Sequence, residues 1–204
     1  MSSPSRRVAL VADAGSYVGP AIATLLAQRG HDLVVGNPAA GLVAELEALG
    51  AAVAAVDDVK LNRPEASARL VEAGLVRFGR IDAATMFSGR IVTGSFLKST
   101  PDDLAAAVRG CLEAPYHFLK AVVPPMVEQG DGQVLVLTSA AGARPTPNAP
   151  LYSAARAGAT MLVRNLAAEV ASRNVQVNAL GTNFMDFPAF RAASGADDPA
   201  VRDR

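Results

Sequence analysis

A serine, a tyrosine and an arginine stand at spacings that could place three polar groups around one substrate oxygen. Ser139 ends an apolar run that predicts a β-strand, Tyr152 follows it by thirteen residues, and Arg156 follows Tyr152 by four. Tyr152 lies near the start of a predicted helix, because Pro150 suits a first helical turn. Residues four apart on a helix share one face, with Cβ atoms about 5–6 Å apart. A phenol beside a cation can transfer a proton and a serine can donate a hydrogen bond, so the set predicts acid–base chemistry at an oxygen.

Strands and helices that alternate along the chain must position this set. Apolar, β-branched runs predict strands, and apolar residues at helical spacing predict the helices between them. The alternation favours an α/β fold with one doubly wound parallel sheet. We expect a single Rossmann-like domain over residues 1–204, with an irregular segment at 186–204 bordering the site and without the last helix and strand of such folds. The predicted strands are 7–12, 31–36, 51–56, 81–87, 133–139 and 175–180, and the predicted helices are 20–28, 41–49, 64–78, 101–127 and 150–172.

The composition excludes several kinds of site. Lys and Arg total 19, Asp and Glu total 19, and no basic run occurs, so neither a nucleic acid nor an anionic membrane is an expected partner. One cysteine, Cys111, allows no internal disulfide, and two isolated histidines provide no metal-ligand cluster. No apolar run reaches membrane-spanning length, and residues 1–7 are polar. We therefore expect a cytoplasmic protein with a small, weakly charged substrate.

The loop after the first predicted strand bears on cofactor binding. Folds of this class place glycines there, so that backbone amides and a helix N-terminus can approach a pyrophosphate. Residues 12–19 resemble the loop of short-chain dehydrogenases and reductases, Thr-Gly-x-x-x-Gly-x-Gly, but Asp13 and Tyr17 replace the first two glycines and Gly19 alone remains. A carboxylate repels a diphosphate and a phenol fills its space, so we expect no cofactor. A turn one register over, using Gly15, is the alternative.

Other positions depart from the dehydrogenases in the same direction. The second predicted strand ends at Gly36 and Asn37, without the acid or base that selects NAD or NADP in such folds. Met86 and Phe87 stand where the dehydrogenases carry two asparagines, and Arg156 stands where they carry a ribose-binding lysine. A guanidinium can favour a tyrosinate without serving as a ribose ligand.

This combination resembles a narrower family, the halohydrin dehalogenases. Their loop, Thr-x4-Phe/Tyr-x-Gly, is matched by residues 12–19 at the aromatic residue and the glycine but not at the threonine. The resemblance implies a cofactor-free lyase that converts a vicinal haloalcohol to an epoxide and a halide. Tyr152, helped by Arg156, would take the hydroxyl proton while Ser139 bonds the oxygen. The alkoxide would then displace the halide, and small anions would open epoxides in reverse.

The same resemblance implies a halide pocket and a substrate pocket. Backbone amides can bind a small anion, and the edge of an aromatic ring suits a polarizable one. The aromatic residues of the C-terminal segment could equally pack in a core or a dimer interface. The halide-binding candidates are Tyr17, Thr182, Asn183, Phe184 and Met185. The substrate-pocket candidates are Ser88, Ala141, Phe187 and Phe190.

Two other functions fit the same residues. Ser139 and Tyr152 would equally serve an NAD(P)H-dependent reductase of this fold, and a catalytically inactive subunit could keep both without using them. Members of the superfamily usually pair through their long helices, so the resemblance implies a homotetramer built as a dimer of dimers. The expected small-molecule partners are a haloalcohol or epoxide and a halide or other small anion.

Overall fold

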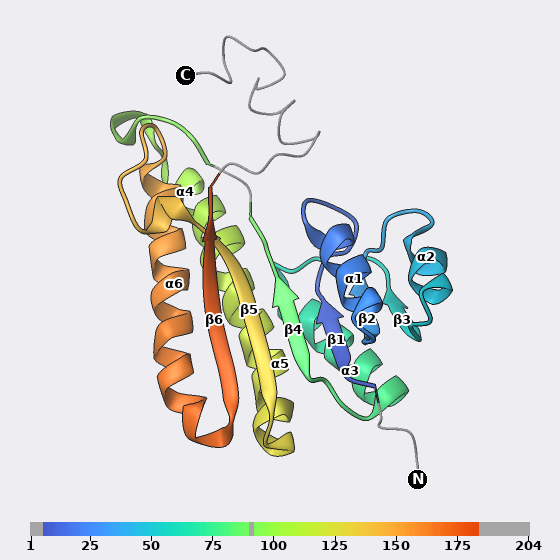
Figure 1. Cartoon of the computed structure of the whole chain (residues 1–204). Helices are drawn as coiled ribbons and strands as arrows, with labels where there is room; N and C mark the ends of the chain where they lie inside the picture. The colour runs from blue at the N-terminus through green and yellow to red at the C-terminus, as the bar shows by residue number, and fades with distance from the viewer. Residues whose placement is uncertain (1–5, 90–91, 184–204) are drawn as a thin grey trace.

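A computed structural model describes residues 6–89 and 92–183. Its centre is a six-stranded parallel sheet with the order β3-β2-β1-β4-β5-β6 (Figure 1), which confirms the predicted doubly wound α/β fold. The strands are β1 Val8–Val11, β2 Asp32–Gly36, β3 Val53–Val56, β4 Ala83–Met86, β5 Gly132–Ser139 and β6 Val175–Thr182. The helices are α1 Gly19–Gln28, α2 Leu42–Ala48, α3 Pro64–Phe78, α4 Pro101–Val108, α5 Ala114–Gln129 and α6 Pro150–Val170.

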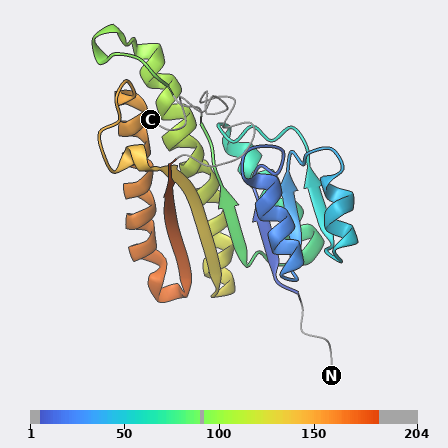
Figure 2. The same cartoon turned by 45° about the horizontal axis from the view of Figure 1, so that its top comes forward.

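Two hydrophobic cores lie on opposite faces of the sheet, because successive side chains of a strand point to opposite sides. In β1, Val8 and Leu10 belong to the core that contains residues of α3, α5 and α6. Ala9 and Val11 belong to the second core, with residues of α1 and α2. Figure 2 shows these two helices, in blue and cyan, on one side of the sheet. Strand β1, buried on both faces, therefore forms an unbroken apolar run in the sequence.

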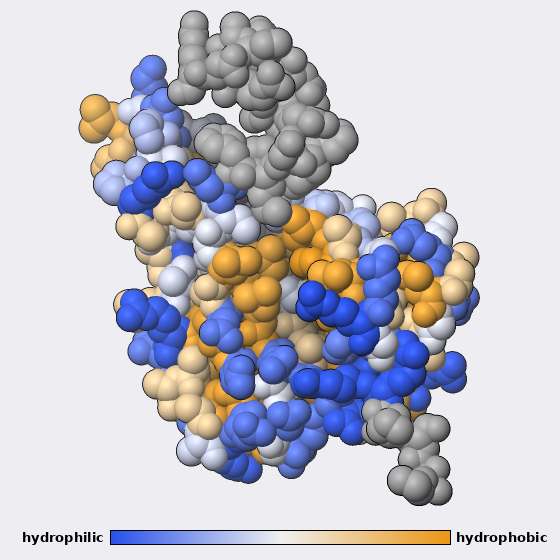
Figure 3. Space-filling model, viewed as in Figure 1, coloured by the Kyte–Doolittle hydropathy of each residue, from blue (hydrophilic) through white to orange (hydrophobic). Residues whose placement is uncertain are grey.

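One face of the sheet over β4, β5 and β6 carries no described helix (Figure 1). In β6 the side chains of Val175 and Val177 are buried. The residues that follow each of them, Gln176 and Asn178, are exposed, and Leu180 is 50% exposed. Apolar residues gather in the middle of this view of the surface (Figure 3). The alternation of buried and exposed residues along β6 is typical of a strand that is covered on one side only.

The long predicted helix 101–127 is interrupted. A π-helical turn, Arg109–Glu113, separates α4 from α5. The Gly110 carbonyl in this turn accepts a hydrogen bond from the Ser88 hydroxyl at 2.7 Å, so the irregular turn has a side-chain partner. The turn also carries Cys111, and Gly89 packs closely against it. A Cβ atom added to Gly89 would lie 2.6 Å from the Cys111 sulfur. The apolar pattern predicts one continuous helix over 101–127, so the π-helical turn differs from that prediction.

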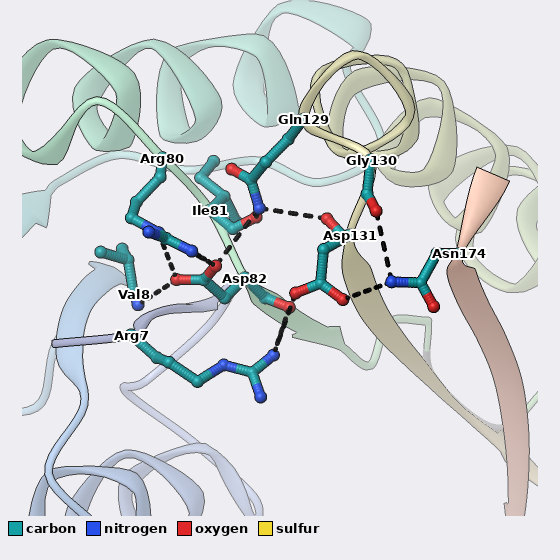
Figure 4. Close-up of polar contacts among 9 residues, drawn as sticks. All are labelled: Arg7, Val8, Arg80, Ile81, Asp82, Gln129, Gly130, Asp131 and Asn174. Atoms are coloured by element: carbon teal, nitrogen blue, oxygen red, sulfur yellow. Dashed lines mark hydrogen bonds and ion pairs between the residues drawn. The ribbon is translucent and has the colours of Figure 1, made fainter. Parts of the chain in front are cut away.

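A buried carboxylate stabilises the edge of the sheet at the amino ends of the strands (Figure 4). The side chain of Asp82 has no exposed surface and accepts hydrogen bonds from the Val8 amide at 2.7 Å, from the Arg80 guanidinium and from the Gln129 amide at 3.2 Å. Burial alone would raise the pKa of Asp82. The hydrogen bonds from Arg80 and Val8, together with the charge of Arg80, outweigh burial and hold this pKa below its usual range.

Candidate active site

A cavity of about 840 Å³ opens at the carboxyl ends of β5 and β6. Ser139 is the last residue of β5, and Tyr152 and Arg156 lie in the first two turns of α6, which Pro150 begins. All three side chains line this cavity. The structure thus brings together the three residues that were selected from their spacing.

Arg156 places a buried positive charge beside the Tyr152 ring. Tyr152 is 7% exposed and Arg156 is 5% exposed, and the guanidinium carbon lies 5.2 Å from the ring centroid. Arg156 Nη2 donates to the Ser88 carbonyl, whereas Nε and Nη1 have no hydrogen-bond partner among the described residues. None of the described residues that line the cavity is an aspartate or a glutamate. This charge would stabilise a tyrosinate formed when the phenol gives up its proton.

Ser139 is oriented by its own backbone. Its Oγ accepts a hydrogen bond from the Ala141 amide at 3.2 Å, where the chain leaves β5 in a short 3₁₀ turn. Because that contact uses the oxygen as an acceptor, the hydroxyl proton remains for donation to a ligand. Ser139 can therefore donate to an oxygen that Tyr152 also reaches from the same cavity.

Five of the other predicted site residues also line the cavity, and four lie outside the described residues. The five that line it are Tyr17, Ser88, Ala141, Thr182 and Asn183. The four outside are Phe184, Met185, Phe187 and Phe190. Sequence reasoning missed Arg144, Pro145 and Pro147 on the loop between β5 and α6, which also contribute to the wall. The proline-rich composition of that loop is the feature of the sequence that could have pointed to these residues.

Cys111 is fully buried and belongs to the hydrophobic cluster that contains Tyr152 and Ala141. Burial raises the pKa of its thiol, and the positive charge of Arg156 opposes that effect in part. A buried thiol whose protonated form is favoured is a poor nucleophile, so Cys111 packs rather than reacts.

Tyr17 lies across the crevice where a parallel sheet of this order binds a dinucleotide. The strand order reverses between β1 and β4, and dinucleotides bind outside the carboxyl ends of the strands at such a point. Tyr17, from the loop after β1, packs its ring against Phe87, just after β4, with centroids 4.9 Å apart. Its hydroxyl lies 3.2 Å from Thr182 Oγ1 at the end of β6. The phenol therefore connects the ends of three strands.

Asp13 occupies the donors that a phosphate would use. Its carboxylate accepts hydrogen bonds from the Gly15 amide at 2.9 Å and from the Ser16 hydroxyl at 3.3 Å. The retained Gly19 has a packing role, because a Cβ there would lie 2.0 Å from the Asp13 carbonyl oxygen. In this arrangement Asp13 and Tyr17 obstruct the crevice, and the expectation that no cofactor binds stays a prediction.

The described residues contain no group of three or more His, Cys, Asp or Glu side chains that could hold a metal ion. Within the same residues, no helix is both long and apolar enough to cross a membrane. The expected cytoplasmic location stays a prediction.

Comparison with known proteins identifies similar enzymes. A family model described as short chain dehydrogenase matches residues 7–198. A 3-oxoacyl-(acyl-carrier-protein) reductase of Synechocystis is 33% identical over 91% of this chain and 76% of its own. Subunit BbsC of a hydroxy(phenyl)methylsuccinyl-CoA dehydrogenase of Thauera aromatica is 32% identical, over 94% and 78% of the two chains. The crystal structure of an acetoin dehydrogenase from Enterobacter cloacae has a TM-score of 0.83 at 27% identity, over 94% and 80%.

The dehalogenase activity expected from the sequence is wrong. Relatives that are similar over nine-tenths of the chain are named as reductases and dehydrogenases, which favours the alternative of a reductase over that of a lyase. The expectation depended on two short patterns, the loop 12–19 and the spacing of Tyr152 and Arg156. Residues that move a proton at an oxygen serve several reactions, so these patterns did not select one. Haloalcohol, epoxide and halide are no longer the expected ligands.

Proposed function

Because this chain belongs to the short chain dehydrogenase family, we propose that it is an oxidoreductase that interconverts a carbonyl group and an alcohol. One observation carries the proposal: Ser139, Tyr152 and Arg156 line a single cavity at the carboxyl edge of the sheet. Catalytic residues of open α/β sheets gather at that edge.

In this proposal Tyr152 moves the proton of the reaction. During reduction the phenol donates its proton to the carbonyl oxygen, and during oxidation the tyrosinate takes the proton of the alcohol. Ser139 donates a hydrogen bond to the same oxygen and favours the negative charge that develops there. Arg156 stabilises the tyrosinate through its buried charge. The hydride would come from a nicotinamide dinucleotide, which the crevice would admit only when the Tyr17 side chain moves aside.

The substrate class follows from the relatives and from the cavity wall. Two relatives are named 3-oxoacyl-(acyl-carrier-protein) reductases. Leu137, Pro145 and Pro147 make part of the wall apolar. Arg144 adds a positive charge, and none of the described lining residues is an aspartate or a glutamate. A 3-oxoacyl thioester, with a carbonyl beside an apolar chain, fits this mixture and is the first substrate to test.

The test measures NADH and NADPH consumption by the purified chain with acetoacetyl-CoA and, separately, with acetoin. We expect turnover that Tyr152→Phe lowers by about 10²–10⁴-fold, because the variant loses only the proton donor. Tyr116→Phe is the matched control, since Tyr116 is 49% exposed on α5 and does not line the cavity. Turnover that persists in Tyr152→Phe would contradict the assignment.

A second candidate is a subunit of a larger dehydrogenase that binds substrate without transferring hydride. It is favoured by the Asp13 carboxylate, which takes the amide and hydroxyl donors of the loop. One relative is itself named as a dehydrogenase subunit. This candidate predicts that acetoacetyl-CoA binds in the cavity while neither nucleotide is consumed.

We also propose that copies of the chain pair through the long helices. Half-exposed apolar residues on three helices support this: Leu104 on α4, Tyr116 on α5 and Met161 on α6. Sedimentation of the purified chain would separate a tetramer, a dimer and a monomer.

A further inference from the structure

The direction of the hydrogen bond between Tyr17 and Thr182 follows from its neighbours. The Thr182 hydroxyl donates to the Thr138 carbonyl at 3.3 Å, so its single proton is already used. Thr182 Oγ1 can therefore accept a hydrogen bond from the Tyr17 hydroxyl, which lies 3.2 Å away. The phenol is held at both ends, by this bond at its hydroxyl and by the Phe87 ring at its face.

Phe87 belongs to a wall between two cavities. The larger cavity, about 840 Å³, is lined by Tyr17, Tyr152 and the segment 87–89. The smaller, about 470 Å³, is lined by the same segment together with Asp13 and Arg109. The two cavities thus lie on either side of Phe87, along the crevice at the switch point of the sheet. Tyr17 lines only the larger cavity, so a ligand that spans both must pass Phe87 and the Tyr17 ring that packs on it.

The backbone of Tyr17 is in a conformation that a tyrosine rarely adopts. Its φ is +53°, in the left-handed region that glycine enters freely and that other residues avoid. A non-glycine residue stays in this region only where its surroundings hold it, and such outliers cluster at functional sites. Phe87 and Thr182 both contact the side chain of Tyr17.

We propose that Tyr17 is a gate that keeps a nicotinamide dinucleotide out of the crevice. While the phenol bonds Thr182 and packs on Phe87, the two cavities are separate. When the side chain rotates away, the cavities join beside Tyr152 and admit the dinucleotide. The choice of this ligand rests on the proposed oxidoreductase function, but the closure itself rests on the contacts of Tyr17.

The test measures the affinity of the whole chain for NADH and NADPH by titration calorimetry, with AMP as a half-length probe. We expect Tyr17→Gly to bind the dinucleotides at least about tenfold more tightly than the wild type, because it removes the ring and suits the left-handed backbone. AMP is small enough for the cavity that Tyr17 does not line, so its affinity should change less than about twofold. Tyr17→Phe removes the hydrogen bond to Thr182 but keeps the ring on Phe87, so it should give an intermediate gain.

Thermal unfolding checks that each variant folds, and Tyr116→Phe, which keeps the ring, reports the effect of losing a tyrosine hydroxyl elsewhere. Equal dinucleotide affinity in the wild type and Tyr17→Gly would overturn the gate, as would an equal gain for AMP. If Tyr17→Gly binds NADH more tightly but neither protein reduces a carbonyl, the gate stands and the proposed function fails. If the wild type reduces acetoacetyl-CoA and Tyr17→Gly binds no better, the function stands and the gate fails.

Discussion

The guanidinium of Arg156 lies 5.2 Å from the centre of the Tyr152 ring and is held there by a hydrogen bond to the Ser88 carbonyl. Both residues come from one turn of α6, while Ser88 follows β4. The charge near the phenol is thus fixed by two separate elements of the fold. Its buried position makes it effective, because little solvent screens it.

Removal of this charge should slow the proposed reaction without removing the proton donor. We expect Arg156→Met to lower kcat by at least about tenfold, since the variant keeps much of the side-chain volume and loses the positive charge. Arg156→Lys should retain more activity than Arg156→Met, because an ammonium keeps the charge but lacks the planar fork that reaches Ser88. Steady-state kinetics with acetoacetyl-CoA on both variants would measure this order. An equal loss in the two would show that the charge is unimportant.

Loss of the Ser139 hydroxyl should affect the transition state more than substrate binding. The hydroxyl accepts from the Ala141 amide and donates toward the cavity, so Ser139→Ala removes a donor where negative charge develops. We expect kcat to fall by about 10²–10³-fold with a smaller change in KM. Ser153→Ala, on the next residue after Tyr152, is a control outside the lining residues. A change confined to KM would assign Ser139 to ground-state binding.

The sequence predicted the sheet well because β1 and β2 are buried on both faces and form clear apolar runs, while β6 alternates apolar and polar residues over its first half. It also placed Ser139, Tyr152 and Arg156 together, since spacing along one strand and one helix determines their positions. It pointed to Tyr17 as an obstruction but not to its partner Phe87, because contacts between distant loops leave no local pattern. The π-helical turn at Arg109–Glu113 was missed for a similar reason, since its hydrogen bond to Ser88 depends on tertiary packing. The reaction was predicted wrongly because short polar patterns are common to different chemistries.

The Gly19 position should tolerate no side chain. A Cβ there would lie 2.0 Å from the Asp13 carbonyl oxygen, a backbone atom that cannot move without shifting the loop. We expect Gly19→Ala to lower the free energy of unfolding by about 1–3 kcal/mol. Gly158→Ala in α6 is the matched control, because its nearest neighbour, Leu112, would be 3.5 Å away. That variant should be neutral or more stable by up to about 1 kcal/mol, and urea unfolding of both would decide.

The Asp82 carboxylate should make the stability of the chain depend on pH. Its folded pKa is lowered, so it stabilises the fold above the unfolded value of about 3.9, and this contribution is lost as the pH falls through the folded pKa. Asp82→Asn should cost about 1.5–3 kcal/mol at neutral pH, because the buried carboxylate loses the charge that strengthens its hydrogen bonds from Val8 and Arg80.

Below about pH 4 the difference between wild type and Asp82→Asn should shrink, because acid also neutralises the wild-type carboxylate. Asp131→Asn provides the control: Asp131 is 46% exposed and pairs with Arg7 at 3.7 Å, so its loss should cost less than about 1 kcal/mol. Urea unfolding of the three proteins at several pH values measures these differences. A cost of Asp82→Asn that stays constant from neutral to acid pH would mean that shape and packing, rather than the charge of Asp82, stabilise this edge of the sheet.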